Sequence, residues 1–345
     1  MNVGILTFHD GINYGAFFQV YALHCFLRQH GFQCQVINYK SLGFTLREYL
    51  VFLHPRLPVQ QIMRNIVKIR KFQKAQRRLC LTRRMLTGAR LAGHHFDRVI
   101  IGSDEVWNFR TRLIGYDPVY FSQGLKADRF ISYAASFGNV DSHEDIPEQL
   151  RAALGRIEYV SVRDANSAQI MRGISRKPVQ IVMDPTFLVD IQMESIRPRE
   201  RGFILVYGFF DAAMMRQVRE YARYVGKRTL SAGYQCAGCD ISLDTLSPFE
   251  WLGYFATCDC VITTMFHGMV FSLLNQKEFC MFSTPYRKKK VGTFLSDLEL
   301  SNRFVNSGGA ITEAFAEPID YLRVSARLAI WRRESEKFLL GALQS

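Results

Sequence analysis

The chain has 345 residues, of which 48% are hydrophobic and 22% charged, so it is neither a disordered, a fibrous nor a membrane-embedded protein. Its length fits two domains of ordinary size. The net charge of +13 is uneven, because residues 49–96 contain eleven Lys or Arg and no Asp or Glu, and the other 297 residues carry only +2. That basic segment predicts an anionic partner: a nucleic acid, a membrane surface or a phosphorylated substrate.

The amino-terminal residues lead directly into an apolar strand pattern, without a basic leader or a cleavage site of small residues. No uncharged apolar run approaches the length of a membrane span. We therefore expect a cytoplasmic protein. Four cysteines raise the question of zinc because the first two have a knuckle spacing, but we expect plain packing and no metal, since the last two do not. They are Cys236, Cys239, Cys258 and Cys260.

Strands and helices alternate through the first half of the sequence. A buried strand at 3–8, a helix with apolar spacing up to Leu27 and a strand at 33–38 form a first strand–helix–strand unit. After the basic segment the alternation resumes, with strands at 98–101, 129–134, 159–162 and 180–183 and helices at 147–157 and 164–172. This pattern predicts one doubly wound domain over residues 1–190, with a basic insertion at 49–96.

A polar segment at 190–201 predicts a linker, after which the alternation starts again. Strands are expected at 203–207, 228–231, 260–263 and 279–282, and helices at 213–225, 248–256 and 268–274. We expect a second Rossmann-like domain over 191–318 and a final amphipathic helix within 319–345. Two such α/β domains can face a cleft, where the carboxyl ends of both sheets meet a ligand, and we expect the active site there.

Two loops of the first half carry candidate binding residues. The loop with Asn13 and Gly15 precedes a helix, whose free amides and dipole favour an anion, although simple capping by Asn13 is the alternative. Polar groups beside an indole suit a sugar, which stacks on the ring while its hydroxyls form hydrogen bonds. The strand at 98–101 is followed by four such residues, predicted to bind an acceptor: Ser103, Asp104, Trp107 and Asn108. A helix cap followed by a buried Trp is the alternative.

Three further segments carry charge or a titratable ring at expected strand ends. Arg163 can grip a carboxylate or phosphate with two parallel donors, or form an ordinary ion pair. His267 begins a helix after a strand, and imidazole can exchange a proton near neutral pH, so it is a candidate general acid or base. A loop after the strand at 279–282 carries four cations that either bind a donor anion or are merely solvated: Arg287, Lys288, Lys289 and Lys290.

At these positions the chain resembles the polysaccharide pyruvyl transferase family, over nearly its whole length. The segments that carry the resemblance, in order, are 13–15, 19–23, 102–108, 135–138, 161–164, 184–185 and 266–268 with Phe271. Their order and spacing together are more specific than any one of them. Many family members have an Arg two positions before the histidine, in the place of Met265.

The resemblance implies two Rossmann-like domains in the type B glycosyltransferase arrangement. It also implies transfer of pyruvate from phosphoenolpyruvate to a sugar, as a cyclic ketal, on a precursor of capsule, exopolysaccharide or cell wall that is often lipid-linked. For this chain we expect His267 as the main acid or base, Asp104 at the acceptor hydroxyls, and Arg163 and the loops as donor-binding groups. No cofactor or metal is required.

Two rival functions stay open at the level of sequence. A type B glycosyltransferase that uses a nucleotide sugar has the same architecture. A non-enzymatic protein could bind an anionic polymer such as a nucleic acid through residues 49–96, but aromatic stacking platforms are scarce there, so we expect no nucleic acid.

Within the basic segment, an apolar helical face lies beside cations. That face consists of Ile62, Ile66, Ile69 and Phe72. It predicts contact with the anionic inner surface of the cytoplasmic membrane. Packing of the same face onto the domain is the alternative. Lys68, Lys71 and Lys74 are among the neighbouring cations.

Overall fold

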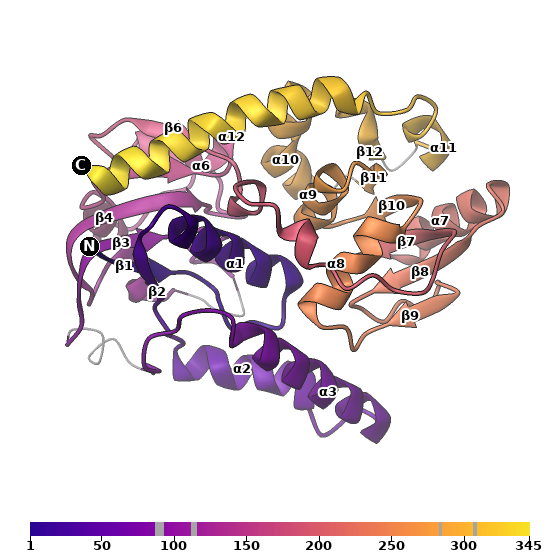
Figure 1. Ribbon diagram of the computed structural model, residues 1–345, viewed down its shortest axis with the longest axis horizontal. Coiled ribbons are helices and arrows are strands. Elements are labelled where there is room, and N and C mark those ends of the chain that lie inside the picture. The colour runs from indigo at the N-terminus through magenta and orange to yellow at the C-terminus, as the bar shows by residue number, and fades with distance from the viewer. Residues whose placement is uncertain (87–92, 112–115, 283–284, 306–308) are drawn as a thin grey trace. The chain divides into compact units, whose positions relative to one another are not determined.

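The computed structural model describes residues 1–86, 93–111, 116–282, 285–305 and 309–345, which form two compact units (Figure 1). Unit 1 comprises Met1–Pro58, Gln76–Val189 and Ala329–Ser345, and unit 2 comprises Val59–Ala75 and Asp190–Leu328. Each unit is built on one six-stranded parallel sheet with helices, so the predicted α/β class with two doubly wound domains is confirmed.

The sheet of unit 1 has the strand order β2-β1-β3-β4-β5-β6. Its strands are β1 (Asn2–Leu6), β2 (Gln33–Val36), β3 (His95–Ile101), β4 (Lys126–Ala135), β5 (Tyr159–Val162) and β6 (Val179–Ile181). Its main helices are α1 (Tyr14–Gln29), α2 (Leu42–Leu53), α5 (Glu148–Leu154) and α6 (Ala165–Arg172). From β1 the chain continues to β2 on one side of the sheet, and from β3 it continues to β4 on the other side. The loops after β1 and β3 therefore form the switch point where such sheets bind ligands.

Unit 2 has the strand order β12-β11-β10-β7-β8-β9. Its strands are β7 (Phe203–Tyr207), β8 (Arg228–Ala232), β9 (Ile241–Leu243), β10 (Cys260–Thr263), β11 (Glu278–Phe282) and β12 (Phe304–Val305). Its helices include α3 (Val59–Gln76), α7 (Ala212–Tyr224), α8 (Pro248–Thr257), α9 (Phe266–Leu274), α10 (Pro285–Asp297) and α11 (Ile311–Ala314). Here the switch point lies between β7 and β10.

Burial explains why the central strands were readable from sequence. Every residue of β7 is buried, and Val3, Ile5 and Leu6 of β1 have no exposed surface. A parallel strand covered on both faces needs a continuous apolar run, and these segments supply one. The edge strands β9 and β12, with three and two residues, carry too short a signal and were not predicted.

Three other features differ from the sequence-based expectation. Residues 287–290 do not form a loop, because α10 begins at Pro285 and includes them. Helix α12 (Tyr321–Gln344) is not a separate segment, since it begins in unit 2 and its residues from Ala329 onward belong to unit 1. Helix α3 lies in the basic segment but belongs to unit 2, and not to the amino-terminal domain.

Helix α3 packs on unit 2 through a face that includes a cation. Ile69 and Phe72 are buried, as the packing alternative required, and Lys68 is buried beside them. Lys68 Nζ donates to the Gly233 carbonyl over 2.6 Å. Burial lowers the pKa of Lys68 to about 8, although Asp244 opposes this effect.

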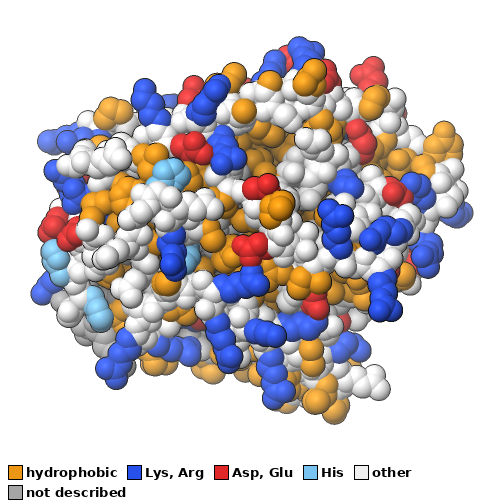
Figure 2. All heavy atoms as spheres, in the orientation of Figure 1, with side chains coloured by type: hydrophobic (Ala, Val, Ile, Leu, Met, Phe, Trp, Pro, Cys, Tyr) orange, Lys and Arg blue, Asp and Glu red, His pale blue; other side chains and the backbone are white. Residues whose placement is uncertain are grey.

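Two neighbouring cations of α3 are paired within the same unit. Arg64 reaches Asp244 over 3.2 Å and Lys71 reaches Glu250 over 2.7 Å. The contacts of Arg64, Lys68 and Lys71 therefore hold α3 in place. On the face drawn in Figure 2, Lys and Arg cover more of the surface than Asp and Glu.

The described residues form neither a membrane-spanning helix nor a cluster of metal ligands. No helix among them is both long enough and apolar enough to cross a bilayer. No three His, Cys, Asp or Glu side chains in the described ranges are grouped as metal ligands. Of the four cysteines considered for zinc, Cys258 and Cys260 are buried, whereas Cys236 and Cys239 are half-buried.

Candidate active site

The loop after β3 turns sharply at the switch point of unit 1. Gly102 has φ of +110°, and a Cβ there would lie 2.5 Å from the Tyr133 carbonyl oxygen. Asp104 also has a positive φ, of 75°, which is uncommon for a residue with a side chain and is often found at functional sites. The turn brings the side chain of Asp104, 17% exposed, to the edge of the sheet while Ser103 stays fully buried.

Arg163 follows β5 and lies between two carboxylates. Its Nη1 donates to Asp184 Oδ2 over 2.8 Å and its Nη2 to Asp104 Oδ1 over 3.4 Å. The Arg163 side chain is only 3% exposed. Burial alone would lower the pKa of Arg163, but Asp184 and Asp104 outweigh it and raise the pKa above its ordinary value, so the guanidinium stays charged.

The ion pairs of Arg163 correspond to one of the two readings that the sequence left open. Arg163 was expected either to grip a donor anion or to form an ordinary ion pair, and here its guanidinium faces the carboxylates of Asp184 and Asp104. The carboxylate oxygens of Asp104 can accept hydrogen bonds from hydroxyl groups.

Asp184 is the residue of this site whose role the sequence did not reveal. Its Oδ2 also accepts from Ser103 Oγ over 3.2 Å, and its Oδ1 accepts from Thr186 N over 3.1 Å at the start of a short 3₁₀ helix. It has 2% of its surface exposed. The Asp-Pro pair at 184–185 was a signal in the sequence, but only the fold brings it to the end of β5.

The other predicted acceptor residues are more deeply placed than a sugar site requires. Trp107 has no exposed surface, and its Nε1 donates to the Tyr120 carbonyl over 3.1 Å. The indole therefore belongs to the core and offers no ring face for stacking, contrary to the prediction. Asn108 is 6% exposed, and its Nδ2 donates to Glu105 Oε2 over 3.0 Å, which steadies the loop.

The loop between β1 and α1 is the other half of this switch point. Asn13 is the residue that caps α1, and its Oδ1 accepts from Ala16 N over 3.2 Å. Glu48 of α2 accepts from Ile12 N over 2.9 Å and fixes the loop from the other side. Capping, the structural alternative, thus occupies the Asn13 side chain, and Gly15 is buried in the first turn.

His267 lies at the switch point of unit 2, in the first turn of α9. Residue Met265 is at the cap position, and its side chain makes no capping hydrogen bond. The His267 ring is half-buried, with its centroid 5.1 Å from that of Phe266 at an interplanar angle of 80°. An imidazole beside the positive end of a helix dipole can meet an anionic ligand and exchange a proton with it.

Close packing fixes the direction of α9. Thr263 Oγ1 donates to the Tyr207 carbonyl over 2.7 Å and accepts from Met265 N over 3.0 Å. A Cβ on Gly268 would lie 2.1 Å from Thr263 Oγ1, so only glycine allows α9 to approach β10 this closely. These contacts hold His267 at the carboxyl end of β10.

An exposed aromatic residue near this switch point was missed from sequence. Phe209 follows β7, is 65% exposed, and its ring centroid lies 5.0 Å from that of Tyr234. Its backbone N–H donates to Thr264 Oγ1 over 3.0 Å, which links it to the segment before His267. An aromatic residue directly after a buried strand was the available signal.

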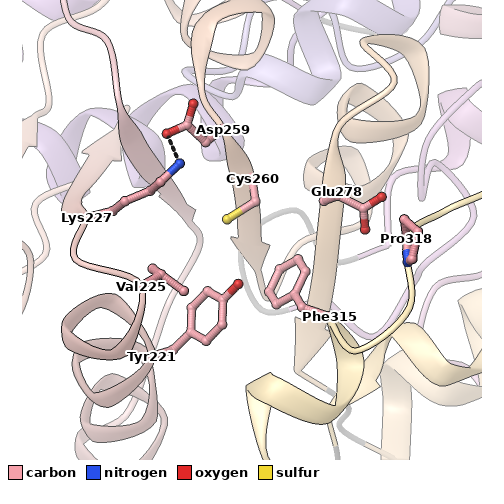
Figure 3. A pocket seen from close by; sticks show the side chains of 8 residues that line it. All are labelled: Tyr221, Val225, Lys227, Asp259, Cys260, Glu278, Phe315 and Pro318. Atoms are coloured by element: carbon pink, nitrogen blue, oxygen red, sulfur yellow. Dashed lines mark hydrogen bonds and ion pairs between the residues drawn. The ribbon is translucent and has the colours of Figure 1, made fainter.

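A cavity of about 280 Å³ lies elsewhere in unit 2 (Figure 3). Cys260 and Glu278, the first residues of β10 and β11, line it, so it lies at the amino-terminal ends of the strands. Lys227 and Asp259 at its edge form an ion pair over 2.6 Å. Ligands of doubly wound sheets bind at the opposite ends, and this cavity is therefore separate from the candidate site.

Solved structures similar to this chain include an epimerase, a heptosyltransferase and a glycosyltransferase. A UDP-GlcNAc 2-epimerase of Methanocaldococcus jannaschii, in complex with UDP-GlcNAc and UDP, has a TM-score of 0.49 and 9% identity over 100% of this chain and 99% of that chain. The E. coli heptosyltransferase WaaC with ADP has a TM-score of 0.43 and 10% identity over 97% and 100%. The glycosyltransferase SnogD from Streptomyces nogalater has a TM-score of 0.43 and 10% identity over 99% of each chain. These values are too low to carry a function from those proteins to this one.

The family comparison is more specific. A search of curated proteins found no match. The family model for polysaccharide pyruvyl transferase, however, matches residues 13–285, which include Asn13, the Asp104 turn, Arg163 and His267. The chain is therefore a transferase that belongs to the polysaccharide pyruvyl transferase family.

Proposed function

We propose that the protein transfers the enolpyruvate-derived group of phosphoenolpyruvate to a sugar of a bacterial surface polysaccharide precursor, forming a pyruvate ketal. The observation that carries the proposal is the position of His267 at the start of α9, at the switch point of unit 2, in a chain of this family. The amides of that first turn favour an anion, and the imidazole is the group that can move a proton.

The chemistry requires two proton movements. The methylene carbon of phosphoenolpyruvate takes up a proton, and one sugar hydroxyl attacks the adjacent carbon and loses its own proton. The carbon–oxygen bond to phosphate breaks, and a second sugar hydroxyl closes the ring as phosphate leaves. Two hydroxyl protons are released, of which one is retained in the new methyl group and the other leaves with phosphate. His267 is the proposed acid or base for these transfers.

The donor is assigned to groups that carry positive charge. Phosphoenolpyruvate has a carboxylate and a phosphate, so it needs donors for both. We assign it to the first turn of α9. The sequence-based expectation adds the amides near Asn13 and Gly15 and the cations of Arg287, Lys288, Lys289 and Lys290, whose side chains lie outside the part of the chain that the structure describes. Because β11 pairs with β10, α10 begins beside the strand end that carries His267.

The acceptor is assigned to the cluster of Asp104, Arg163 and Asp184 in unit 1. Asp104 is the partly exposed member of that cluster and accepts hydrogen bonds, as sugar hydroxyls require. Arg163 is a positioning residue that holds Asp104, while Ser103 and Asn108 stabilise its loop. Trp107 supports the turn from the core.

The test is an incubation of the purified protein with phosphoenolpyruvate and a panel of lipid-linked and aryl sugars. Release of phosphate together with the mass gain of a pyruvate ketal on the sugar is the expected result. Consumption of a nucleotide sugar in place of phosphoenolpyruvate would instead identify a glycosyltransferase. Binding of RNA without any turnover would identify a non-enzymatic protein. A cytoplasmic location belongs to the same proposal.

A further inference from the structure

Helix α2 exposes one leucine in every turn. Leu42, Leu46 and Leu50 are 60%, 63% and 49% exposed. Their i, i+4 spacing places them on one side of the helix. Phe44 and Glu48 are the buried residues of α2, and they lie on the opposite side. The helix is thus anchored by one face and presents an apolar face to solvent.

Helix α3 repeats this arrangement. Val59, Met63 and Val67 are 76%, 58% and 42% exposed, and Arg70 and Lys74 continue the same side as exposed residues. At about 100° per residue these five positions fall within an arc of about 80°. The face of α3 that packs on unit 2, described above, is the opposite one.

The exposed apolar residues therefore differ from those that the sequence suggested. The sequence-based face contained Ile69 and Phe72, which are buried, and Lys68 points inward with them. The exposed face instead contains Val59, Met63 and Val67, which the sequence-based face did not include. Only the fold distinguishes the two faces.

The segment that contains α3 is rich in exposed cations. Residues 49–96 contain no Asp or Glu, so nothing in the segment offsets its cations. Among its residues that the structure describes, seven Lys and Arg are exposed: Arg56, Arg70, Lys74, Arg77, Arg78, Arg83 and Arg84. Figure 2 shows Lys and Arg side chains beside hydrophobic ones over the region where Figure 1 draws α3.

We infer that the exposed face of α2 in unit 1 and the exposed face of α3 in unit 2 each dock on the surface of a bilayer that contains anionic lipid. Soluble monomers rarely expose large apolar residues in ordered stripes, and two consecutive helices do so here. A helix with apolar and basic residues on its outer face lies in the membrane interface, with its cations at anionic headgroups. A nucleic acid would meet the cations but leave the leucines in contact with phosphate or water.

This docking does not depend on the proposed chemistry. It would bring the enzyme to the surface where a lipid-linked acceptor is held, but vesicle binding can be measured without any substrate. If the protein does not bind vesicles, the proposed transferase reaction is unaffected, and if that reaction is not observed, the membrane docking can still be measured.

The test is co-sedimentation of the full-length protein with vesicles of phosphatidylglycerol mixed with phosphatidylcholine, against phosphatidylcholine alone. The apolar variant is Leu46→Gln/Met63→Gln, and its matched control is Met193→Gln/Leu322→Gln, which changes residues that are 83% and 84% exposed elsewhere. We expect the apolar variant to lower the partition coefficient about tenfold or more, and the control to bind like the wild type.

A second pair of variants tests the charge. Arg70→Gln/Lys74→Gln removes two cations of the α3 face, whereas Arg216→Gln/Arg219→Gln removes two exposed cations of α7. The first is expected to lower binding to anionic vesicles about tenfold at low salt, with a smaller difference at high salt, and the second to have little effect. Phosphate release with a water-soluble acceptor should be unchanged in all four variants.

Four results would overturn the inference. Wild-type protein that does not sediment with anionic vesicles, or binds neutral vesicles equally well, excludes it. Equal binding of the test variants and their controls also excludes it. Retention on RNA that falls in the Arg70→Gln/Lys74→Gln variant but not in the apolar one, without vesicle binding, would assign the surface to nucleic acid.

Discussion

Arg163 donates to Asp184 over 2.8 Å, and the two side chains are 3% and 0% exposed. The pair joins the end of β5 to the segment after β6, and Asp104 is held at its open side. A buried pair of this kind is costly to break because the remaining partner keeps an uncompensated charge.

Arg163→Ala is expected to lower the free energy of unfolding by about 3 to 5 kcal/mol, since Asp184 is left buried without its cation. The comparison is Lys227→Ala, which removes a partner from the pair with Asp259, whose side chains are 40% and 35% exposed. That change is expected to cost about 1 kcal/mol or less. Denaturant unfolding followed by circular dichroism measures both. Equal losses in the two variants would show that the Arg163 pair has no special structural role.

The same residue also tests the division of the site. Arg163→Lys keeps the charge but loses the two parallel donors that reach Asp184 and Asp104. If Arg163 positions Asp104, this variant raises KM for the acceptor more than KM for phosphoenolpyruvate. A selective rise in the donor KM would restore the direct donor-binding role that the sequence suggested.

Sequence patterns predicted the central strands because each of them is a continuous run of buried, mostly apolar residues. Strands β5, β7 and β10 have the predicted bounds, and their ends carry Arg163 and His267 as expected. The strands β9 and β12 of unit 2 were missed because their short segments show no clear apolar period, and α10 was missed because it begins with Pro-Tyr and four cations.

The candidate site was less readable than the fold, because its character depends on contacts between distant segments. Asp184 lies 21 residues from Arg163, and only the pairing of β5 with β6 brings them together. The burial of Trp107 and the inward direction of Lys68 likewise follow from neighbours that the local sequence does not name.

Replacing His267 by Gln is expected to abolish phosphate release while the protein stays folded. The ring is half-buried in the first turn of α9 and is not part of the core, so little packing is lost. Phosphate release in the presence of acceptor, with the thermal midpoint measured in parallel, gives the two readouts. His143→Gln, at an exposed position of unit 1, is the matched control. Turnover near the wild-type rate would remove His267 from the mechanism.

Introducing an arginine at Met265 is expected to strengthen donor binding. Met265 precedes α9 at the position where many family members have Arg, and the cation would lie beside the first turn of that helix. We expect Met265→Arg to lower KM for phosphoenolpyruvate several-fold. Met193→Arg adds the same charge at an exposed residue of unit 2 and should leave KM unchanged. An unchanged KM in both variants would mean that the donor does not approach residue 265.

Two glycine substitutions with opposite expected signs test the packing of α9. A Cβ at Gly268 meets Thr263 Oγ1 at 2.1 Å, whereas a Cβ at Gly341 meets nothing within 4 Å. Gly268→Ala should therefore destabilise the protein by about 1 to 3 kcal/mol and displace His267. Gly341→Ala, within α12, should stabilise it by about 0.5 to 1 kcal/mol. Stabilisation by both substitutions would show that α9 does not need this close approach to β10.

The buried histidine of α1 predicts how stability changes with pH. His24 is 2% exposed, and burial, with a smaller effect of Arg28, lowers the pKa of His24 to about 4. In the unfolded chain the imidazole takes up its proton near pH 6.5, so between these values the unfolded state binds more protons than the folded one. The free energy of unfolding should therefore fall as the pH drops from about 6.5 towards 4.

Denaturant unfolding at a series of pH values between 7.5 and about 4 measures this dependence. His24→Gln keeps a hydrogen-bonding side chain but cannot take up the proton, so its stability should fall less steeply over the acid range than that of the wild type. His143→Gln replaces an exposed histidine of unit 1 and is the matched control, which should follow the wild-type curve. If His24→Gln loses stability as steeply as the wild type, other groups cause the acid sensitivity and burial of His24 contributes little to it.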